Sequence, residues 1–372
     1  MNVKTMISAL VAGGCAVALA ATTVMSAQAP PSGGGAQVGQ APGGPGGRGR
    51  AGGPGGPGGF GGGRGPQNQV ASPMDVQQML AALPRMAPAT PKANRRVLVF
   101  SRASGFVHSS IPIAARTIEA LGTVPVPGEP GPGRPTQAWT TVISFDLADI
   151  TPENLAQYDL IFLNNTTGTF LDDPDDPAGT EARRKALMDF VRSGKGLAAI
   201  HSATDSYHKG GAPLWQEFNH MIGGSFKFHW NYPTPIWLKV DDVDNPINRP
   251  FTRVSPQTGQ RVAAPIMVVD EVYTFSQDSW SRERVRTLLS VDYDRMPQEI
   301  KDQEPANGKR TDGDYGISYI RREGQGRVYV NVLGHDHGIY KIPAMLEHIL
   351  AGMQYALGDL EGVDDTPVPL QK

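Results

Sequence analysis

The chain has only one cysteine, Cys15, in 372 residues. Cys15 lies inside an apolar N-terminal stretch with the features of an export signal, so we expect the processed protein to contain no thiol. A chain without thiols forms no disulfide and offers no cysteine nucleophile. Gly14-Cys15 is also a poor match to a lipoprotein signal, because apolar sequence continues after it.

Residues 1–29 have the pattern of a signal peptide. Lys4 precedes the apolar, small-residue stretch from Met6 to Met25, and Ala27-Gln28-Ala29 resembles a cleavage site. Pro30 disfavours cleavage directly after Ala29, so cleavage after Ala27 and a non-cleaved anchor are the alternatives. We expect an exported protein, periplasmic or secreted, with no stable membrane span after cleavage.

Residues 30–72 lack acidic side chains and are rich in Gly and Pro, with scattered Arg48, Arg50 and Arg64. Such a segment buries too little apolar surface to fold, so it predicts a disordered linker. The net charge of −2 gives no support for a nucleic-acid partner. A phosphate-binding loop and a GxGxxG turn are also missing, so no nucleotide cofactor is expected.

Residues 91–360 are long enough for one α/β domain. Arg96–Phe100, Leu160–Leu163 and Gly196–Ile200 are apolar runs typical of strands buried on both faces. Helical patterns at 111–121 and 181–192 alternate with them, which predicts a flavodoxin-like parallel sheet flanked by helices. The C-terminal half predicts additional antiparallel strands at 236–240, 266–275, 286–291, 317–321 and 327–333.

Polar clusters follow several of these strands, and ligands of open α/β sheets bind beyond the carboxyl ends of the strands. A cleft explains this recurrence better than separate turns do. The clusters are His108 in the loop after the first strand, Asn164 to Thr167, His201 with Asp205, Asp270-Glu271, and His335-Asp336-His337.

Six segments of the chain, in matching order from about Arg95 to Gly358, resemble the ThuA-like (trehalose utilisation) family. They are Gly105 to Ser109; Tyr158 to Leu160 with Asn165 to Gly168; Ile200 to Asp205; Gly223 to His229; Asp270 to Tyr273; and Gly326 to Tyr329 with Leu333 to Asp336.

This resemblance implies a fold similar to class I glutamine amidotransferases and an association with sugar catabolism, but no assigned reaction. Gly316 to Tyr319 and Trp230 depart from the usual family pattern, which bears on the substrate-facing wall. His201 looks like the occupant of the turn that carries the nucleophilic cysteine in glutamine amidotransferases. With no thiol available, we do not expect a glutaminase.

The histidines at the strand ends are the main candidates for chemistry. Neutral imidazoles bind divalent ions, zinc above all, so His201, His229 and His335 are predicted metal ligands. Metal-free acid–base catalysis and purely structural hydrogen bonding are the alternatives. The catalytic candidates, with Asp205 or Glu271 as base or orienting carboxylate, are His108, His201, Asp205, Glu271 and His335.

Other polar and aromatic residues are candidates for binding a sugar. The alternative is that these residues only close polar loops or pack in the core. The substrate-binding candidates are Asn165, Thr166, Thr167, Tyr207, Trp230, Tyr273 and Asp336. His337 is the less favoured neighbour of His335, and His208, His220 and His348 carry no motif and are expected at the surface or in packing.

Together these observations predict an exported carbohydrate-processing enzyme that uses a metal ion for isomerisation, cleavage or hydrolysis of a sugar or keto-sugar. A non-catalytic sugar-binding module and a partner-binding scaffold are the two alternatives. Several convergent histidines favour chemistry over binding alone.

Overall fold

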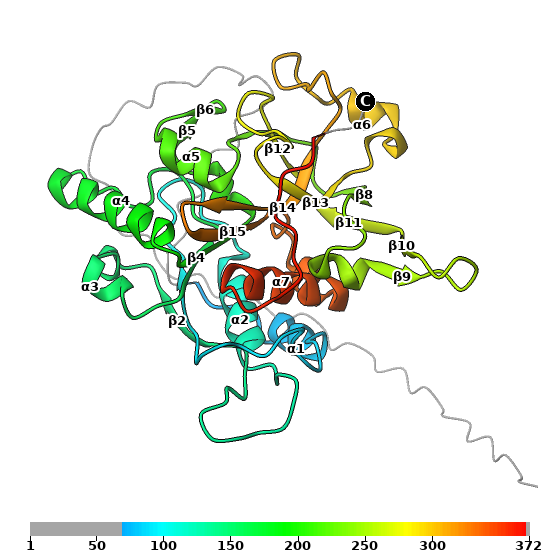
Figure 1. The fold of residues 1–372 in the computed structure, drawn as a ribbon. Coiled ribbons are helices and arrows are strands. Elements are labelled where there is room, and N and C mark those ends of the chain that lie inside the picture. Colours follow the sequence, from blue (N-terminus) through cyan, green and yellow to red (C-terminus); the bar gives the residue numbers. More distant parts are fainter. Residues whose placement is uncertain (1–68, 370–372) are drawn as a thin grey trace, which may run out of the picture. The chain divides into compact units, whose positions relative to one another are not determined.

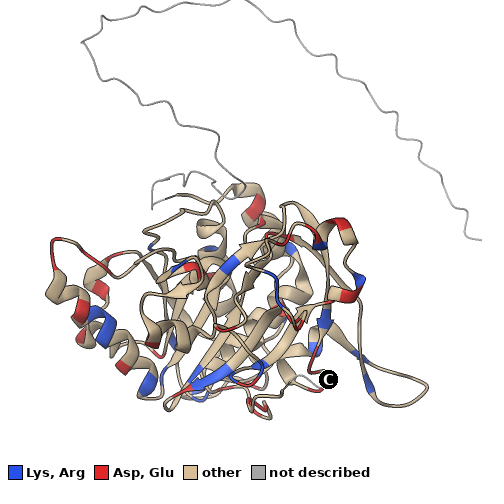
Figure 2. Ribbon diagram, turned by 90° about the horizontal axis from the view of Figure 1, so that it is seen from above, with Lys and Arg blue, Asp and Glu red and all other residues tan. Residues whose placement is uncertain are grey.

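The computed structural model describes residues 69–369 (Figure 1). The predicted signal peptide and nearly all of the predicted linker lie outside the described residues. Within residues 69–369, no helix is both long enough and apolar enough to cross a bilayer. Basic and acidic side chains are interspersed along the described elements (Figure 2).

A nine-stranded sheet forms the core, and the fold is mixed α/β as predicted. Five parallel strands make up one half of it, and four antiparallel strands extend it. The strand order is β11 (Ile266–Asp270), β8 (Thr234–Val240), β13 (Arg286–Val291), β14 (Gly316–Glu323), β15 (Gly326–Asn331), β4 (Gly196–Ile200), β3 (Leu160–Asn164), β1 (Arg96–Phe100) and β2 (Thr140–Ser144).

The parallel half positions the ends of the strands that carry polar clusters. Every residue of β3 and β4 is buried, as the continuous apolar runs predicted. The chain passes from β1 to β2 on one side and from β3 to β4 on the other. The direction of winding therefore reverses between β1 and β3, where doubly wound sheets open a crevice.

Three longer helices cover the sheet: α2 (Ile111–Gly122), α4 (Pro177–Arg192) and α7 (Pro343–Ala356). Right-handed crossovers in opposite directions place α2 and α4 on opposite faces. The α4 helix begins earlier than predicted, because the Asp176 side chain accepts the Gly179 N–H and Pro177 starts the first turn. On α7, a Cβ at Gly352 would meet the Tyr329 ring at 2.4 Å, so glycine lets helix and sheet approach closely.

Short elements complete the described chain. The helices are α1 (Pro73–Ala81), α3 (Pro152–Leu155), α5 (Gln216–Ile222) and α6 (Gln298–Lys301), with 3-10 turns η1 (Leu147–Asp149), η2 (His201–Asp205), η3 (Pro246–Phe251), η4 (Tyr293–Arg295) and η5 (His337–Lys341). Small two-stranded sheets pair β5 (His208–Lys209) with β6 (Ala212–Pro213), β9 (Thr252–Val254) with β10 (Arg261–Ala263), and β7 (Phe226–His229) with β12 (Tyr273–Phe275).

The prediction of one continuous strand from 266 to 275 is wrong, and the difference affects the position of Glu271. The segment forms two strands in different sheets, β11 and β12, with Glu271 at the break. The buried Asp270 carboxylate accepts the backbone N–H groups of Gly334 at 2.6 Å and Asp336 at 2.7 Å. These bonds tie the end of β11 to the loop after β15, so Glu271 leaves the main sheet beside that loop.

Candidate metal centre

Four side chains from separate loops converge at the carboxyl ends of the parallel strands. His201 follows β4, His335 follows β15, His108 lies in the loop after β1, and Glu271 occupies the break after β11. One ligand atom from each of the four lies within 4.8 Å of the others. We call these four residues the histidine–glutamate cluster.

The Glu271 carboxylate is the point where three imidazoles meet. His335 Nδ1 lies 3.0 Å and His201 Nε2 3.5 Å from Glu271 Oε2. His229 Nε2 lies 3.3 Å from the other oxygen, Oε1. The three predicted metal ligands thus lie against one carboxylate, but His108, and not His229, completes the closest group of four.

Neighbouring carbonyl groups settle which nitrogen of two rings carries the proton. His201 Nδ1 lies 3.0 Å from the Val332 carbonyl oxygen, and His229 Nδ1 lies 3.0 Å from that of Trp230. A carbonyl oxygen only accepts, so each Nδ1 must be the N–H donor. In the neutral ring, Nε2 then carries a lone pair that faces Glu271, as in metal-binding histidines with an oriented outer shell.

Among the described residues, two buried ring nitrogens of this cluster make no hydrogen bond, namely His201 Nε2 and His335 Nδ1. Both lie close to Glu271 without hydrogen-bond geometry to it. The lone pair of neutral His201 is repelled by the carboxylate unless a cation lies between them, whereas His335 Nδ1 attracts the carboxylate when that ring is protonated. Three imidazole nitrogens and one carboxylate oxygen are a donor set that suits zinc and similar divalent ions, so these residues can hold such an ion.

The ionisation of two members of the cluster, His108 and Glu271, fits the same role. Burial and the nearby His201 lower the pKa of His108 to about 2, which leaves this ring neutral. Burial alone would raise the pKa of Glu271, but contacts with His201 and His335 outweigh it and hold that pKa well below its usual range. Neutral imidazole and ionised carboxylate are the forms that bind metals.

The backbone at His201 is in the left-handed region, with φ at 46°. Such a conformation is uncommon for a residue with a side chain, and it aims the imidazole from a tight turn directly after a buried strand. The Ser202 hydroxyl follows and lies 3.2 Å from His108 Nδ1, so the same turn also orients a second imidazole of the cluster.

The polar run after β3 braces its own loop. Thr166 Oγ1 lies 3.1 Å from Ser206 Oγ, and Thr167 Oγ1 donates to the Phe106 carbonyl at 2.9 Å. Asn165 Nδ2 donates to Asn164 Oδ1, and its own Oδ1 is buried without a partner. These three substrate-binding candidates are fully buried, which corresponds to the loop-closing interpretation.

Two predicted sugar-stacking rings lie in the core. Tyr207 and Trp230 are each 1% exposed, and the Tyr207 hydroxyl donates to Asp172. Trp230 packs edge-on against Phe228 and Tyr315. Neither ring has a face open to a ligand, because large aromatic side chains that fill a core have the same sequence pattern as a sugar platform.

Of the remaining candidates, Tyr273 contacts the cluster, whereas Asp205 and Asp336 have local structural partners. The buried Tyr273 ring packs against His201 with 4.2 Å between centroids. Asp205 Oδ1 lies 2.5 Å from His208 Nε2 instead of contacting the cluster, and Asp336 caps the turn η5.

The histidines without a motif have structural partners. His348 is buried between the Ser318 hydroxyl and the Ile247 carbonyl, and His220 is exposed beside Arg321. His337 contacts Asp75 of α1 at 2.9 Å. Among residues 69–369, these side chains are not part of the closest donor group.

The sequence analysis missed Phe106 and Tyr232, two partly exposed aromatic rings beside the cluster. Phe106 is 37% exposed and its ring centroid lies 4.6 Å from that of His108. Tyr232 is 39% exposed, its ring lies 4.9 Å from His335, and its hydroxyl donates to Asp336. Phe106 stood in a family-like segment, but no sequence signal pointed to Tyr232.

Comparison with known proteins agrees with this architecture. The family profile described as ThuA, trehalose utilisation, matches residues 96–356. A ThuA-like protein from Bacteroides uniformis has 17% identity and a TM-score of 0.52, over 74% of this chain and 98% of that one.

A ThuA-like protein from Parabacteroides merdae has 16% identity and a TM-score of 0.46, over 73% of this chain and 93% of that one. A β-galactosidase from Bacillus circulans has 8% identity and a TM-score of 0.39, over 74% of this chain and 32% of that one. No curated protein sequence matches.

Proposed function

The chain belongs to the ThuA, or trehalose utilisation, family, and on that premise we propose that it is a metal-dependent enzyme acting on a sugar or keto-sugar. The membership itself supports a sugar-related role. The histidine–glutamate cluster supports chemistry at this site, because imidazole and carboxylate ligands are brought together within 4.8 Å. The N-terminal signal pattern supports export to the periplasm or beyond.

The observation that carries the proposal is the buried His201 Nε2, which makes no hydrogen bond among the described residues and faces the Glu271 carboxylate at 3.5 Å. A buried polar atom without a hydrogen bond is costly, and a bound cation removes that cost. A purely structural cluster would instead satisfy this nitrogen with a hydrogen bond.

The residues of the site have two roles, binding of a divalent ion and proton transfer. His108, His201, Glu271 and His335 would hold a divalent ion, which when bound polarises a carbonyl or activates water. His229 stands outside this group of four, against the other Glu271 oxygen, and its side chain is 23% exposed. Because its Nδ1 proton is committed to the Trp230 carbonyl, His229 can accept and release a proton at Nε2.

Two aromatic side chains at this site could contact a bound sugar. Phe106 and Tyr232 contact His108 and His335 respectively and are the partly exposed rings next to the cluster. Carbohydrate rings present apolar C–H faces that pack on such side chains, while hydroxyl or keto oxygens point toward the cluster. Isomerisation, cleavage beside a keto group and hydrolysis all use a polarised oxygen and a proton-transfer group.

The second candidate function is a non-catalytic sugar-binding module. The exposed rings Phe106 and Tyr232 would serve it equally well. The buried His201 Nε2, which makes no hydrogen bond among the described residues, favours the enzyme, because a binding module gains nothing from such an imidazole.

The test combines elemental analysis of chelator-free protein with a turnover and thermal-shift panel of disaccharides, monosaccharides and their keto derivatives. His201→Ala and His335→Ala should lose bound metal and turnover together. His220→Ala, which removes an exposed imidazole outside the cluster, should retain both.

Retention of full metal content in both cluster variants would refute the metal site. Sugar binding without turnover in the metal-loaded protein would support the binding module instead.

A further inference from the structure

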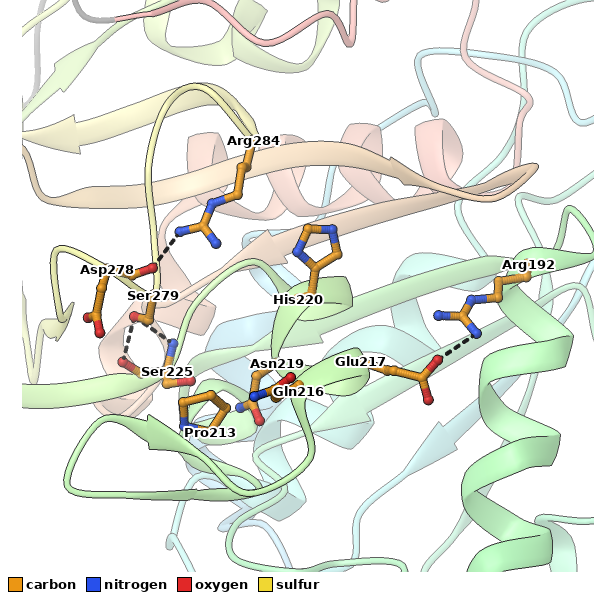
Figure 3. A pocket seen from close by; sticks show the side chains of 10 residues that line it. All are labelled: Arg192, Pro213, Gln216, Glu217, Asn219, His220, Ser225, Asp278, Ser279 and Arg284. Atoms are coloured by element: carbon orange, nitrogen blue, oxygen red, sulfur yellow. Dashed lines mark hydrogen bonds and ion pairs between the residues drawn. The ribbon is translucent and has the colours of Figure 1, made fainter.

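A cavity of about 440 Å³, lined mainly by residues with polar or charged side chains, lies apart from the histidine–glutamate cluster. Figure 3 shows its side chains, which come from the end of α4, from α5 and from the segment after β12. The residues that carry the argument are Gln216, Asn219, His220, Ser225 and Arg284.

The cavity is separated from the cluster by the length of the β7–β12 ribbon. In this ribbon Tyr273 pairs with His229 at the end near the cluster, and Phe275 pairs with Phe226 at the other end. Ser225 directly precedes that far end and lines the cavity. The cavity is therefore a separate site.

Two buried polar atoms in its wall lack partners. Asn219 is 5% exposed and Ser225 0%, yet Asn219 Oδ1 and Ser225 Oγ make no hydrogen bond. The Asn219 amide is held in place, because its Nδ2 donates to the Ser206 carbonyl at 3.1 Å. The Asn219 carbonyl oxygen is thus a fixed acceptor and Ser225 a hydroxyl that lack hydrogen bonds among the described residues, and hydroxyl groups of a ligand that reached them would supply these bonds.

The same wall carries two arginines, Arg192 and Arg284, and two carboxylates, Glu217 and Asp278, of which Glu217 pairs with Arg192 at 3.0 Å. Arg284 has no carboxylate partner among the described residues and donates only to the Asp278 backbone carbonyl at 2.9 Å. Figure 3 shows the Asp278 carboxylate turned away from the Arg284 guanidinium.

Behind His220, the side chain of Arg321 is 9% exposed and its Nη2 lies 3.1 Å from His220 Nε2. Among the described residues, Arg321 Nε and Nη1 make no hydrogen bond, and its carboxylate partner Glu323 is shared with Arg192. Arg321 does not itself line the cavity, but its positive charge lies directly behind the lining residue His220 and adds to the attraction for an anion.

We propose that this cavity binds a small polyhydroxylated anion, a sugar phosphate or a sugar acid, with the anionic group against Arg284 and the hydroxyls against Asn219 and Ser225. The guanidinium provides a planar set of donors for phosphate or carboxylate. The lining contains no Phe, Tyr or Trp, so recognition rests on charge and hydrogen bonds. This site does not depend on the function proposed for the histidine–glutamate cluster.

The test is calorimetric titration and thermal shift of the chelator-treated protein at constant ionic strength. Chelation separates this site from any ion at the cluster. The probes are glucose 6-phosphate, gluconate, inorganic phosphate and glucose. Glucose 6-phosphate or gluconate should bind, the one that binds more tightly identifying the anionic group, while glucose should bind at least about tenfold more weakly because it lacks the charge.

Two variants change the charge of the cavity in different ways. Arg284→Gln should weaken binding of the anion at least about tenfold, as expected for loss of a charged hydrogen-bond donor. Gln216→Glu adds a negative charge at the first position of α5, where an acid suits the helix, so it should fold and also weaken binding. Arg253→Gln is the matched control, because Arg253 is an exposed arginine of β9 that forms no ion pair within residues 69–369.

Four results would overturn the proposal. The first is the absence of heat and thermal shift with both organic anions at millimolar concentration. The second is binding that Arg284→Gln and Gln216→Glu leave unchanged, and the third is glucose binding as tightly as glucose 6-phosphate. Inorganic phosphate binding as tightly as either organic anion would show that Asn219 and Ser225 take no part, which contradicts the polyhydroxylated ligand.

Discussion

His335 Nδ1 lies 3.0 Å from Glu271 Oε2, and this contact joins the loop after β15 to the break between β11 and β12. Burial would lower the pKa of His335, but contact with Glu271 raises it. Asp270 fixes the geometry from below, because its carboxylate holds the N–H groups of Gly334 and Asp336 on either side of His335. Glu271 is consequently the residue on which the cluster depends most.

Replacing Glu271 by Gln tests that dependence. The amide keeps the shape but removes the charge that three imidazoles surround, so affinity for zinc should fall at least about tenfold. Turnover should fall with it, while the circular dichroism spectrum stays unchanged because Glu271 packs in no strand. Glu153→Gln, at an exposed position of α3, is the control. Unchanged zinc affinity in Glu271→Gln would place the ion elsewhere.

Chelation should destabilise the metal-loaded protein. A ligand that binds only the folded state adds about 2.7 kcal/mol of unfolding free energy at a hundredfold excess over its Kd. Differential scanning calorimetry should therefore show a lower Tm after EDTA treatment and recovery on addition of zinc. In His201→Ala, EDTA and zinc should have no effect on the Tm. A Tm that responds to zinc equally in wild type and His201→Ala would contradict the assignment.

Helix α1 lies before the segment that resembles the family, and Asp75 connects it to the domain. Asp75 contacts Lys341 at 2.6 Å and His337 at 2.9 Å, and these bonds lower the pKa of the Asp75 carboxyl. Asp75→Asn should cost at most about 1 kcal/mol of stability, since partly exposed ion pairs are weak. It should nevertheless speed proteolytic cleavage within residues 73–81. Equal cleavage rates in wild type and Asp75→Asn would show that apolar packing alone holds α1.

The parallel strands could be predicted from the sequence because each is a short apolar run bounded by turn residues. The separation of β11 from β12 could not, since it depends on N–H groups of Gly334 and Asp336 that reach Asp270 from a distant loop. The β7–β12 ribbon is likewise a long-range pairing of very short strands. The local sequence pattern contains no information on the break between β11 and β12 or on the pairing of β7 with β12.

The candidate site, too, could be predicted only in part from the sequence. His201, Glu271 and His335 could be proposed because polar residues after buried strands gather at one edge of a sheet. The choice of His108 over His229 as the fourth closest ligand is a matter of loop geometry. The aromatic residues could not be sorted, because a core ring such as Trp230 and a rim ring such as Tyr232 differ only in tertiary surroundings.

Acid should destabilise the fold through His348. Burial lowers the pKa of His348 to about 4, against about 6.5 in the unfolded chain. The unfolded state therefore binds the proton first. Stability from the neutral ring is full above pH 6.5 and is lost as the pH falls toward 4, by about 3 kcal/mol.

Urea unfolding between pH 7 and pH 4 measures this loss. His348→Gln should be less stable at pH 7 but should show a flatter decline, and the difference between the two curves isolates His348 from His108. Parallel curves for the two proteins would contradict the role of His348.

Tyr232 and Phe106 should govern sugar affinity more than the chemical step. Each ring is partly exposed beside a cluster histidine, and Tyr232 is oriented by its hydrogen bond to Asp336. Tyr232→Ala and Phe106→Ala should raise KM about tenfold or more with a smaller change in kcat, because packing on the sugar is the same in the ground and transition states.

Tyr232→Phe keeps the ring, and its KM should lie between those of Tyr232→Ala and wild type. Tyr293→Ala, a half-buried ring of η4, should leave KM unchanged. A fall in kcat with constant KM in Tyr232→Ala would instead assign the hydroxyl to the reaction itself.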